Sequence, residues 1–306
     1  MWTLADIPSQ AGRRAVVTGT GGLGYETALA LAAAGADVVL AGRSETKGRG
    51  STVRILNLHP HASIAFEKLD LANLASIAAF AVQMEANGRP IDLLVNNAGV
   101  MTPPKRQTTT DGFELQFGTN HLGHFALTNL LLEHVTGRVV SVSSVGHRFG
   151  SIDFDDLNWE RKPYQAWRAY GQSKLANLLF TAELQRRLSA AGSAVLATAA
   201  HPGYASTNLQ FHSGRRLLEL MSVVGNRLIA QDENGGALPT LYAAVAGIPG
   251  GSYAGPGRFM EQRGAPRLVG RSNAAMDTDV ACRLWDVSEE LTGVRFPLGA
   301  PAAAQA

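Results

Sequence analysis

Short apolar runs alternate with longer segments of helical periodicity along most of the chain. The runs are apolar on both sides of the alternation, which is typical of strands buried on both faces of a sheet. The predicted strands are RAVVTG (14–19), DVVLAG (37–42), SIAFEKLD (63–70), IDLLVNNAG (91–99), GRVVSVSS (137–144) and AVLATAAHPG (194–203). The predicted helices lie between them, at 24–35, 44–58, 73–85, 111–134 and 164–190.

This alternation of strands and helices predicts an α/β fold, in which helices cover both faces of a parallel sheet. Because crossovers between parallel strands are right-handed, we expect a doubly wound, Rossmann-like sheet. No internal repeat or linker divides residues 1–298, so the sequence predicts a single domain. The segment 204–235 interrupts the alternation, and residues 299–306 are predicted to be a disordered tail.

Composition and charge narrow the classes of function. Of the 306 residues, 45% are hydrophobic and 17% are charged, which describes a soluble globule with a sizeable core. A net charge of +2 is too small to indicate a nucleic-acid partner. The single cysteine, Cys282, excludes an internal disulfide and a cysteine-based zinc site. His121 and His124 lie three residues apart without a third ligand at a useful spacing, so no metal site is expected.

The sequence contains no targeting or membrane signal of a familiar kind. The N-terminal MWTLADIPSQ has an acid and a proline where a signal peptide needs a basic start and an apolar run. No window reaches the roughly 18 unbroken apolar residues of a membrane span. We therefore expect a cytoplasmic protein without a membrane span.

A glycine-rich turn follows the first predicted strand. Gly19, Gly21, Gly22 and Gly24 match G-x-G-x-x-G when the pattern is taken literally. Glycine permits positive φ and a close approach of the backbone to phosphates, and a helix N-terminus attracts a pyrophosphate. The turn therefore predicts nucleotide binding.

The end of the second predicted strand bears on the choice of nucleotide. An NAD-preferring site places an acid there for the ribose hydroxyls, whereas this strand ends in Gly42 and Arg43. Arg43 can pair with a 2′-phosphate, assisted by Ser44 and Lys47, so the sequence favours NADP(H) over NAD(H). The alternative is a solvated arginine at the start of a helix.

Tyr170 and Lys174 are four residues apart in a predicted helix and therefore project from one face. An ammonium beside a phenol favours the phenolate and lowers the phenol pKa, so the tyrosine can exchange protons near neutral pH. Taken alone, this spacing is common by chance, and a plain surface pair is the better interpretation.

Four further motifs occur in a fixed order around this pair. LLVNNAGVM ends the fourth strand, TNHLGHF lies in the next helix, VVSVSS ends the fifth strand and HPGYAST follows the sixth. With these motifs the chain resembles the short-chain dehydrogenase/reductase family over nearly its whole length. HRFGSIDFDDLNWERKPYQAWRA and AMDTDVACRLWDVSEELTG are similar to its retinol-dehydrogenase-like and WW-domain-oxidoreductase-like branch.

The resemblance implies a catalytic tetrad of Asn120, Ser144, Tyr170 and Lys174. It implies that Tyr170 exchanges the proton of the substrate oxygen while Ser144 hydrogen-bonds that oxygen. Lys174 would lower the tyrosine pKa and bind the nicotinamide ribose, and Asn120 would hold a water of a proton relay. Ser144 is preferred over Ser143 because it directly precedes the small-residue turn and because strand alternation points Ser143 the other way.

The resemblance also assigns residues to the cofactor, including Tyr170 and Lys174. The others are Gly19, Thr20, Gly21, Gly22, Leu23, Gly24, Arg43, Ser44, Asp70, Leu71, Asn97, Ala98, Gly99, Pro202, Gly203 and Thr207. Against the family pattern T-G-x-x-x-G-x-G, the stretch from Thr18 to Gly24 lacks one residue. We expect cofactor binding to survive this deletion in weakened form, with more of the 2′-phosphate selectivity resting on Arg43.

These features predict an NADP(H)-dependent alcohol dehydrogenase or carbonyl reductase, acting on an apolar ketone, aldehyde or alcohol. The apolar stretch at 211–230 would cover the substrate, or form a core helix or a dimer contact. Trp159, Tyr164 and Trp167 would line the same pocket or anchor the inserted loop. The alternatives are a nicotinamide-binding sensor or scaffold with little turnover and, less favoured, an epimerase or dehydratase. The resemblance implies a homodimer or homotetramer.

Overall fold

The structure, a computed structural model, describes residues 1–203 and 233–299. In this part of the chain one eight-stranded sheet has the order β3-β2-β1-β4-β5-β6-β7-β8. All neighbouring strands are parallel except β7 and β8, which form an antiparallel hairpin at one edge. The strands are β1 Arg14–Thr18, β2 Asp37–Gly42, β3 Ser63–Lys68, β4 Ile91–Asn96, β5 Val135–Val142, β6 Leu196–Ala200, β7 Tyr253–Arg258 and β8 Arg263–Leu268.

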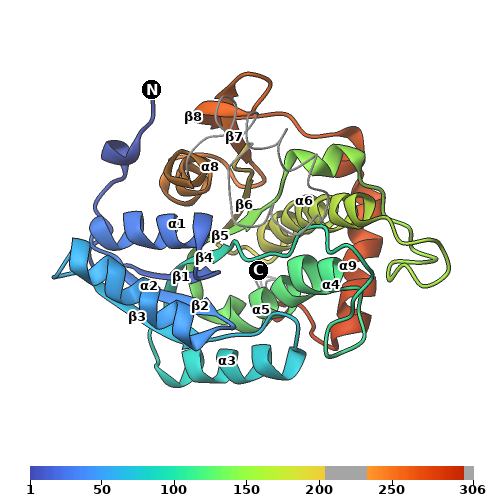
Figure 1. Ribbon diagram of the computed structural model, residues 1–306, viewed down its shortest axis with the longest axis horizontal. Helices are drawn as coiled ribbons and strands as arrows, with labels where there is room; N and C mark the ends of the chain where they lie inside the picture. Colours follow the sequence, from blue (N-terminus) through green and yellow to red (C-terminus); the bar gives the residue numbers. More distant parts are fainter. Residues whose placement is uncertain (204–232, 300–306) are drawn as a thin grey trace, which may run out of the picture.

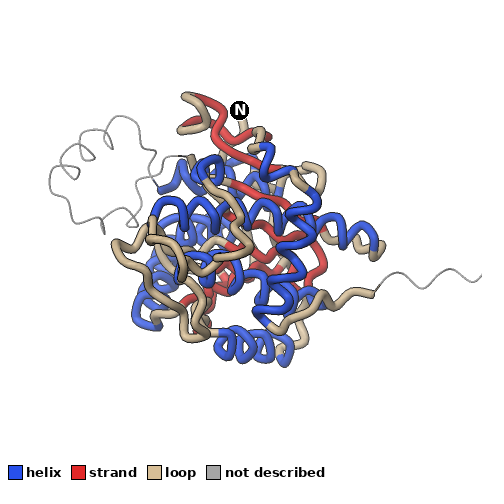
Figure 2. Tube along the Cα trace, turned by 90° about the vertical axis from the view of Figure 1, so that its right-hand side faces the viewer, coloured by secondary structure: helices blue, strands red, loops and turns tan. Residues whose placement is uncertain are grey.

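Helices cover both faces of this sheet (Figures 1 and 2). One face carries α1 Gly22–Ala33, α2 Glu45–Leu58 and α8 Glu233–Val245. The other carries α3 Leu74–Ala86, α5 Gly123–Leu131 and α6 Ala166–Ala190, with α9 Thr278–Thr292 packed against α6. The prediction of a single-domain, doubly wound α/β fold is therefore confirmed.

Successive residues of the central strands enter opposite cores, as the period of two requires. In β1, Val16 joins the core under α3, α5 and α6, while Ala15 and Val17 join the core under α1 and α8. In β2, Val39 and Leu40 divide in the same way. Both faces of each strand are thus apolar, which explains why the strands are visible in the sequence as continuous apolar runs.

The predicted helix 111–134 was wrong at its start and in its regularity. An isolated bridge pairs Thr108 with Glu114, and the Glu114 carboxylate then accepts the backbone N–H of Phe117, so that α4 Leu115–Phe117 begins only there. A π-helical turn, η2 Gly118–Leu122, separates α4 from α5, and a 3-10 turn at Leu132–His134 ends the segment. The inserted residue of a π turn is frequently found at functional sites.

The hairpin of β7 and β8 was not predicted. Its strands, YAGPGR and RGAPRL, are rich in glycine, proline and arginine and have no apolar alternation. β8 is the partly exposed edge strand of the sheet, whereas most of β7 is buried between β6 and β8. Of the predicted segment 204–235, residues 204–232 lie outside the described part of the chain, and so do residues 300–306 of the predicted tail. No helix among the described residues is long and apolar enough to cross a membrane.

Candidate active site

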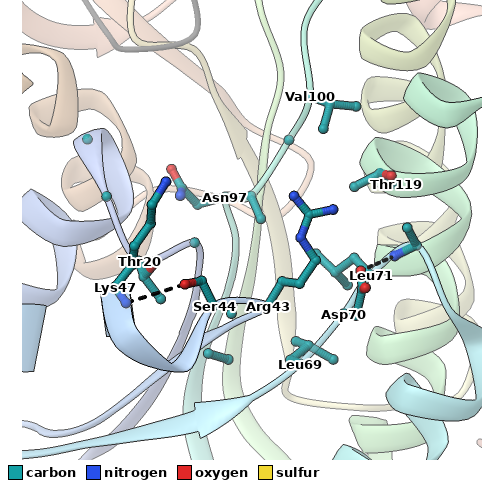
Figure 3. Close-up of a pocket in the computed structure, with 18 of the residues that line it drawn as sticks. Thr20, Arg43, Ser44, Lys47, Leu69, Asp70, Leu71, Asn97, Val100 and Thr119 are labelled. Carbon is teal, nitrogen blue, oxygen red and sulfur yellow. Dashed lines mark hydrogen bonds between the residues drawn. The ribbon is translucent and has the colours of Figure 1, made fainter. Parts of the chain in front are cut away.

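Strands β1 and β4 are neighbours, but the chain leaves them toward opposite faces of the sheet, into α1 and toward α5. Ligands of α/β proteins bind at such a switch point, beyond the carboxyl ends of the strands. A cavity of about 920 Å³ lies there, a size suited to a cofactor (Figure 3). Its described lining is Gly19–Leu23, Ala41–Ser44, Lys47, Gly50, Ser51, Arg54, Leu69–Ala72, Asn97–Met101, Pro103, Pro104, Gln107, Leu115 and Thr119.

The glycine loop is shaped for close approach. Gly19 has a φ of +96° and Gly22 a φ of +51°, conformations that residues with a side chain rarely adopt. A Cβ on Gly19 would lie 2.9 Å from Nδ2 of Asn97, and one on Gly24 would collide with the carbonyl oxygen of Gly19. Helix α1 begins at Gly22, so its free N–H groups face the cavity edge where a pyrophosphate is expected.

Two residues of neighbouring elements hold the shortened loop. The Ser51 hydroxyl on α2 donates a hydrogen bond of 2.7 Å to the carbonyl oxygen of Thr20. The Thr20 side chain occupies the space above Gly42, where an added Cβ would lie 2.6 Å from its methyl carbon. Ser51 and Gly42 therefore hold the loop in position, although it is one residue shorter than the family pattern.

Three cationic side chains line the same cavity as the glycine loop: Arg43, Lys47 and Arg54. Figure 3 shows the Arg43 side chain projecting into the cavity from the end of β2. Among the described lining residues the only carboxylate is Asp70, whose Oδ1 accepts the backbone N–H of Ala72. An excess of positive charge beside a glycine cradle suits the phosphate groups of a dinucleotide.

The floor of the cavity is built on Thr18. Its hydroxyl oxygen accepts the backbone N–H groups of Asn97 and Ala98, both at 2.9 Å. The Asn97 amide nitrogen donates to the Thr18 carbonyl at 2.8 Å. Gly99 comes next, and a Cβ there would lie 3.1 Å from Oδ1 of Asn120 and 3.6 Å from Nζ of Lys174. The turn therefore leads directly from the cavity to the predicted tetrad.

The four tetrad residues come together at this end of the sheet. Ser144 follows β5, and its hydroxyl hydrogen-bonds the phenol of Tyr170 on α6. The Lys174 ammonium lies 5.7 Å from the centroid of the Tyr170 ring and donates to the carbonyl oxygen of Val142 at 3.0 Å. None of the four is a lining residue of the cavity, but Asn120 and Lys174 lie next to Gly99, which is one.

Burial governs the ionisation of the pair. Burial raises the pKa of Tyr170, and the hydrogen bond with Ser144 opposes this rise. Burial also lowers the pKa of Lys174 to about 8. With its pKa raised, Tyr170 is a neutral phenol that can donate a proton at pH 7. The lowering of this pKa by Lys174 stays a prediction.

Asn120 lies in the π turn and is fully buried. Its Oδ1 accepts the N–H of Val100 at 2.7 Å, and its Nδ2 donates to the Val100 carbonyl and to the Ser173 hydroxyl. The Ser173 hydroxyl in turn donates to the carbonyl oxygen of Tyr170. Asn120 therefore fastens the turn after β4 to the catalytic face of α6.

Ser143 and Ser144 have different surroundings. The Ser143 hydroxyl donates to the backbone carbonyl of Lys174 at 2.7 Å, whereas the Ser144 hydroxyl faces Tyr170 and accepts the N–H of Gly146. His147 supports this turn through a bond of 2.7 Å between its Nδ1 and the Ser144 carbonyl. His147 was not among the predicted site residues, although it lies only three residues past Ser144 in sequence.

Other site residues were also missed. Ser51 and Arg54 line the cavity from α2 together with Lys47, which was predicted. The spacing of four and then three residues from Lys47 marks one helical face that the sequence could have shown. Val100, Met101 and Thr119 also line it, and they lie within the motifs LLVNNAGVM and TNHLGHF, although they were not singled out as site residues.

The remaining predicted residues lie toward the other end of the site. Pro202 and Gly203 follow β6, and Gly203 has a φ of +70° with no room for a Cβ beside the carbonyl of Gln262. Neither is a lining residue of the described cavity. Thr207 lies outside the described residues.

Comparison with known proteins gives one family. Residues 13–216 match the family model described as short chain dehydrogenase, which is about two thirds of the chain. The chain belongs to the short-chain dehydrogenase/reductase family. It is 41% identical to human retinol dehydrogenase 13 over 95% of this chain and 88% of that protein. It is also 40% identical to mouse polyprenol dehydrogenase, over 94% of this chain and 86% of the relative.

A solved structure supports the same assignment. An uncharacterised protein from Mycobacterium paratuberculosis superposes with a TM-score of 0.83 and 46% identity, covering 97% of this chain and 99% of the other. The predicted resemblance to the retinol-dehydrogenase-like branch is confirmed by these relatives. As a member of this family of oxidoreductases, the short-chain dehydrogenase described here uses a nicotinamide dinucleotide on small-molecule substrates.

Proposed function

We propose that this short-chain dehydrogenase is an NADP(H)-dependent oxidoreductase that interconverts a carbonyl and an alcohol of an apolar small molecule. The observation that carries the proposal is the position of Ser144, Tyr170 and Lys174. Lys174 adjoins Gly99 of the cavity lining, where an added Cβ would lie 3.6 Å from its Nζ, and its ammonium lies 5.7 Å from the centroid of the Tyr170 ring. Arg43 and Lys47 line the same cavity. A cofactor with its phosphates at the cations would thus present its far end to the phenol of Tyr170.

The residues divide the chemistry of carbonyl reduction between them. The bound cofactor supplies the hydride to the carbonyl carbon. Tyr170 transfers its phenolic proton to the carbonyl oxygen, and the Ser144 hydroxyl hydrogen-bonds the same oxygen as charge develops on it. The reaction leaves a phenolate on Tyr170, which the nearby Lys174 ammonium stabilises. Oxidation of the alcohol runs these steps in reverse.

The preference for NADP(H) rests on the charges of the cavity. Three cations and one carboxylate line it among the described residues, and none of the acids that would bind ribose hydroxyls ends β2. Titration with NADPH and NADH, followed by cofactor fluorescence, tests this preference. We expect NADPH to bind more tightly, and a clear preference for NADH would refute the role of Arg43.

The substrate class rests on an aromatic residue and on the relatives. Trp167 is 66% exposed and stands edge-on to Tyr170, with 6.1 Å between the ring centroids. An exposed indole beside the reacting phenol suits an apolar substrate. Trp159, by contrast, is buried against Tyr164 and anchors the inserted loop. The names of the relatives, retinol and polyprenol dehydrogenase, point the same way for this chain.

A substrate panel tests this part of the proposal. It comprises retinal, a short polyprenal and straight-chain aldehydes and ketones of increasing length, each with NADPH. We expect the rate per bound enzyme to rise with apolar length, and we expect Trp167→Ala to raise KM more than it lowers kcat. Equal rates on polar sugars and long aldehydes would contradict an apolar site.

The alternative of a sensor or scaffold has no support among the described residues, where the tetrad is complete and assembled. A homodimer or homotetramer remains a proposal, which light scattering after size-exclusion chromatography would test. A cytoplasmic location likewise remains a proposal, to be tested by cell fractionation.

A further inference from the structure

His124 is a buried histidine that the proposed chemistry does not use. It lies on α5, one helical turn after Asn120, and is 3% exposed. Its two ring nitrogens contact two different parts of the site. Nδ1 lies 3.0 Å from the carbonyl oxygen of Asn120, and Nε2 lies 3.0 Å from the hydroxyl of Thr18.

The chemistry of these partners fixes the hydrogens on the ring. A carbonyl oxygen can only accept, so Nδ1 of His124 carries a hydrogen and donates it to Asn120. Burial lowers the pKa of His124 to about 4, so the ring is neutral at pH 7 and Nε2 has no hydrogen. Nε2 therefore accepts the hydroxyl hydrogen of Thr18, whose other acceptor in reach, the Val95 carbonyl, is farther away at 3.3 Å.

The Thr18 hydroxyl is thereby fully used. Its oxygen accepts the N–H groups of Asn97 and Ala98, while its hydrogen goes to His124. At the other nitrogen of the ring stands the backbone of Asn120, in the π turn that leaves helical hydrogen bonding irregular. The His124 imidazole thus connects the turn after β4, which lines the cavity, to Asn120, which holds that turn against α6.

Neither metal binding nor core packing explains the two polar contacts of the His124 ring. Among residues 1–203 and 233–299 no group of three or more histidine, cysteine or acidic side chains could hold a metal ion. A packing role alone would not require both ring nitrogens to meet polar groups. His121, in the same helical segment, shows the difference, because only its Nε2 has a partner, the Ser288 hydroxyl.

We propose that His124 is a positioning residue, which sets the cofactor turn and Asn120 relative to each other through its two ring nitrogens. The Thr18 side of the ring serves cofactor binding, and the Asn120 side serves the catalytic step. The catalytic half of this proposal rests on the proposed function, whereas the cofactor half rests only on nucleotide binding.

Two conservative substitutions separate the two halves. An asparagine amide nitrogen can replace Nδ1 but does not reach Thr18, whereas a glutamine side chain can reach Thr18 but moves its amide away from the Asn120 carbonyl. We expect His124→Asn to weaken NADPH binding about fivefold and to lower kcat less than this. We expect His124→Gln to lower kcat about fivefold and to change NADPH binding less. These fold-changes correspond to one net hydrogen bond.

His124→Phe and a matched control complete the set. His124→Phe removes both contacts, so it should weaken cofactor binding and lower kcat together. His121→Phe replaces a histidine of similar burial that touches neither Thr18 nor the Asn120 carbonyl, and both parameters should stay within about twofold of the wild type. Thermal melts of all variants show whether a loss follows from unfolding.

The opposite outcomes overturn the proposal. If His124→Phe binds NADPH and turns over as the wild type does, or if Asn and Gln lose both parameters in proportion to their melting temperatures, His124 is a packing residue only. If His124→Phe does not fold, Thr18→Val tests the same link from the other end, and its loss should not add to that of His124→Asn. If no carbonyl substrate is reduced, the proposed function fails while the NADPH titration still decides the cofactor half.

Discussion

The contact between Thr20 of the glycine loop and Gly42 at the end of β2 leads to a quantitative prediction. In Gly42→Ala, the new Cβ would lie 2.6 Å from the methyl carbon of Thr20, whereas ordinary contacts begin at about 3.4 Å. The backbone φ of Gly42 is not in the positive range, so alanine itself is compatible with the strand end. The clash must therefore be relieved by a turn of the Thr20 side chain or by a shift of the loop.

The size of the effect follows from that relief. An off-rotamer side chain costs about 0.5–1.5 kcal/mol, and overpacking costs about 1–3 kcal/mol. Because Thr20 lines the cavity, a displacement of about 1 kcal/mol should weaken NADPH binding roughly fivefold. The melting temperature should fall by only a few degrees, since about 1 kcal/mol is small against the entropy of unfolding of a chain of 306 residues.

A second substitution makes the test specific. Serine at position 20 lacks the methyl group, and the next nearest atom of that side chain, the hydroxyl oxygen, is 3.6 Å from the new Cβ. Gly42→Ala with Thr20→Ser should therefore bind NADPH nearly as well as Thr20→Ser alone, in a fluorescence titration of all four proteins. If Gly42→Ala weakens NADPH binding equally with threonine and with serine at position 20, the contact between the Thr20 methyl group and position 42 does not hold the loop in place.

Three further predictions follow from the charges and ionisations of the site. Arg43→Ala should weaken NADPH binding about tenfold and leave NADH binding within twofold, as a charged hydrogen bond to phosphate implies; equal losses for both cofactors would contradict this. Lys174→Met should abolish turnover yet raise the melting temperature by a few degrees at pH 7. Burial of the Lys174 ammonium costs on the order of 3 kcal/mol, which methionine avoids, and loss of the hydrogen bond to Val142 offsets part of this gain. The pKa of Lys174 is about 8 in the folded protein and 10.5 in the unfolded chain, so the destabilisation by the buried ammonium is complete below pH 8 and fades as the pH approaches 10.5. The difference in melting temperature between Lys174→Met and the wild type should therefore shrink from pH 7 to pH 10. A constant difference would be evidence against a buried charge. Carbonyl reduction should not lose rate through deprotonation of Tyr170 between pH 6 and 9, since burial raises the pKa of that phenol; a decline in the wild-type rate centred near pH 8 would point to Lys174 instead.

The sequence predicted the central sheet because its strands are buried on both faces. A continuous apolar run such as AVVT in β1 has few alternatives in a soluble protein, and the helices between the runs fix the parallel direction. The hairpin has no such signature, since its two strands are rich in glycine, proline and arginine and lack an apolar pattern, even though most of β7 is buried. The π turn was invisible for another reason: a single inserted residue barely changes the periodicity of a helix more than twenty residues long.

The candidate site was predictable where its residues are close in sequence. The spacing of Tyr170 and Lys174 and the order of the motifs led to the family resemblance, which implies the tetrad. Contacts between elements were not predictable. Thr20 meets Gly42 only because Thr18 pairs with Ala41 in the sheet, which brings the two strand ends side by side. The link from Thr18 through His124 to Asn120 likewise requires the three-dimensional register of β1 and α5.

The central claim is that Tyr170 exchanges the proton in a nicotinamide-dependent reaction. Its most direct test is the rate of NADPH oxidation with an apolar aldehyde, measured for the wild type and for Tyr170→Phe together with their affinities for NADPH. The account predicts one alcohol formed per NADPH consumed by the wild type, a rate at least about 100-fold lower for Tyr170→Phe, and equal cofactor binding. Equal rates for the two proteins would contradict it.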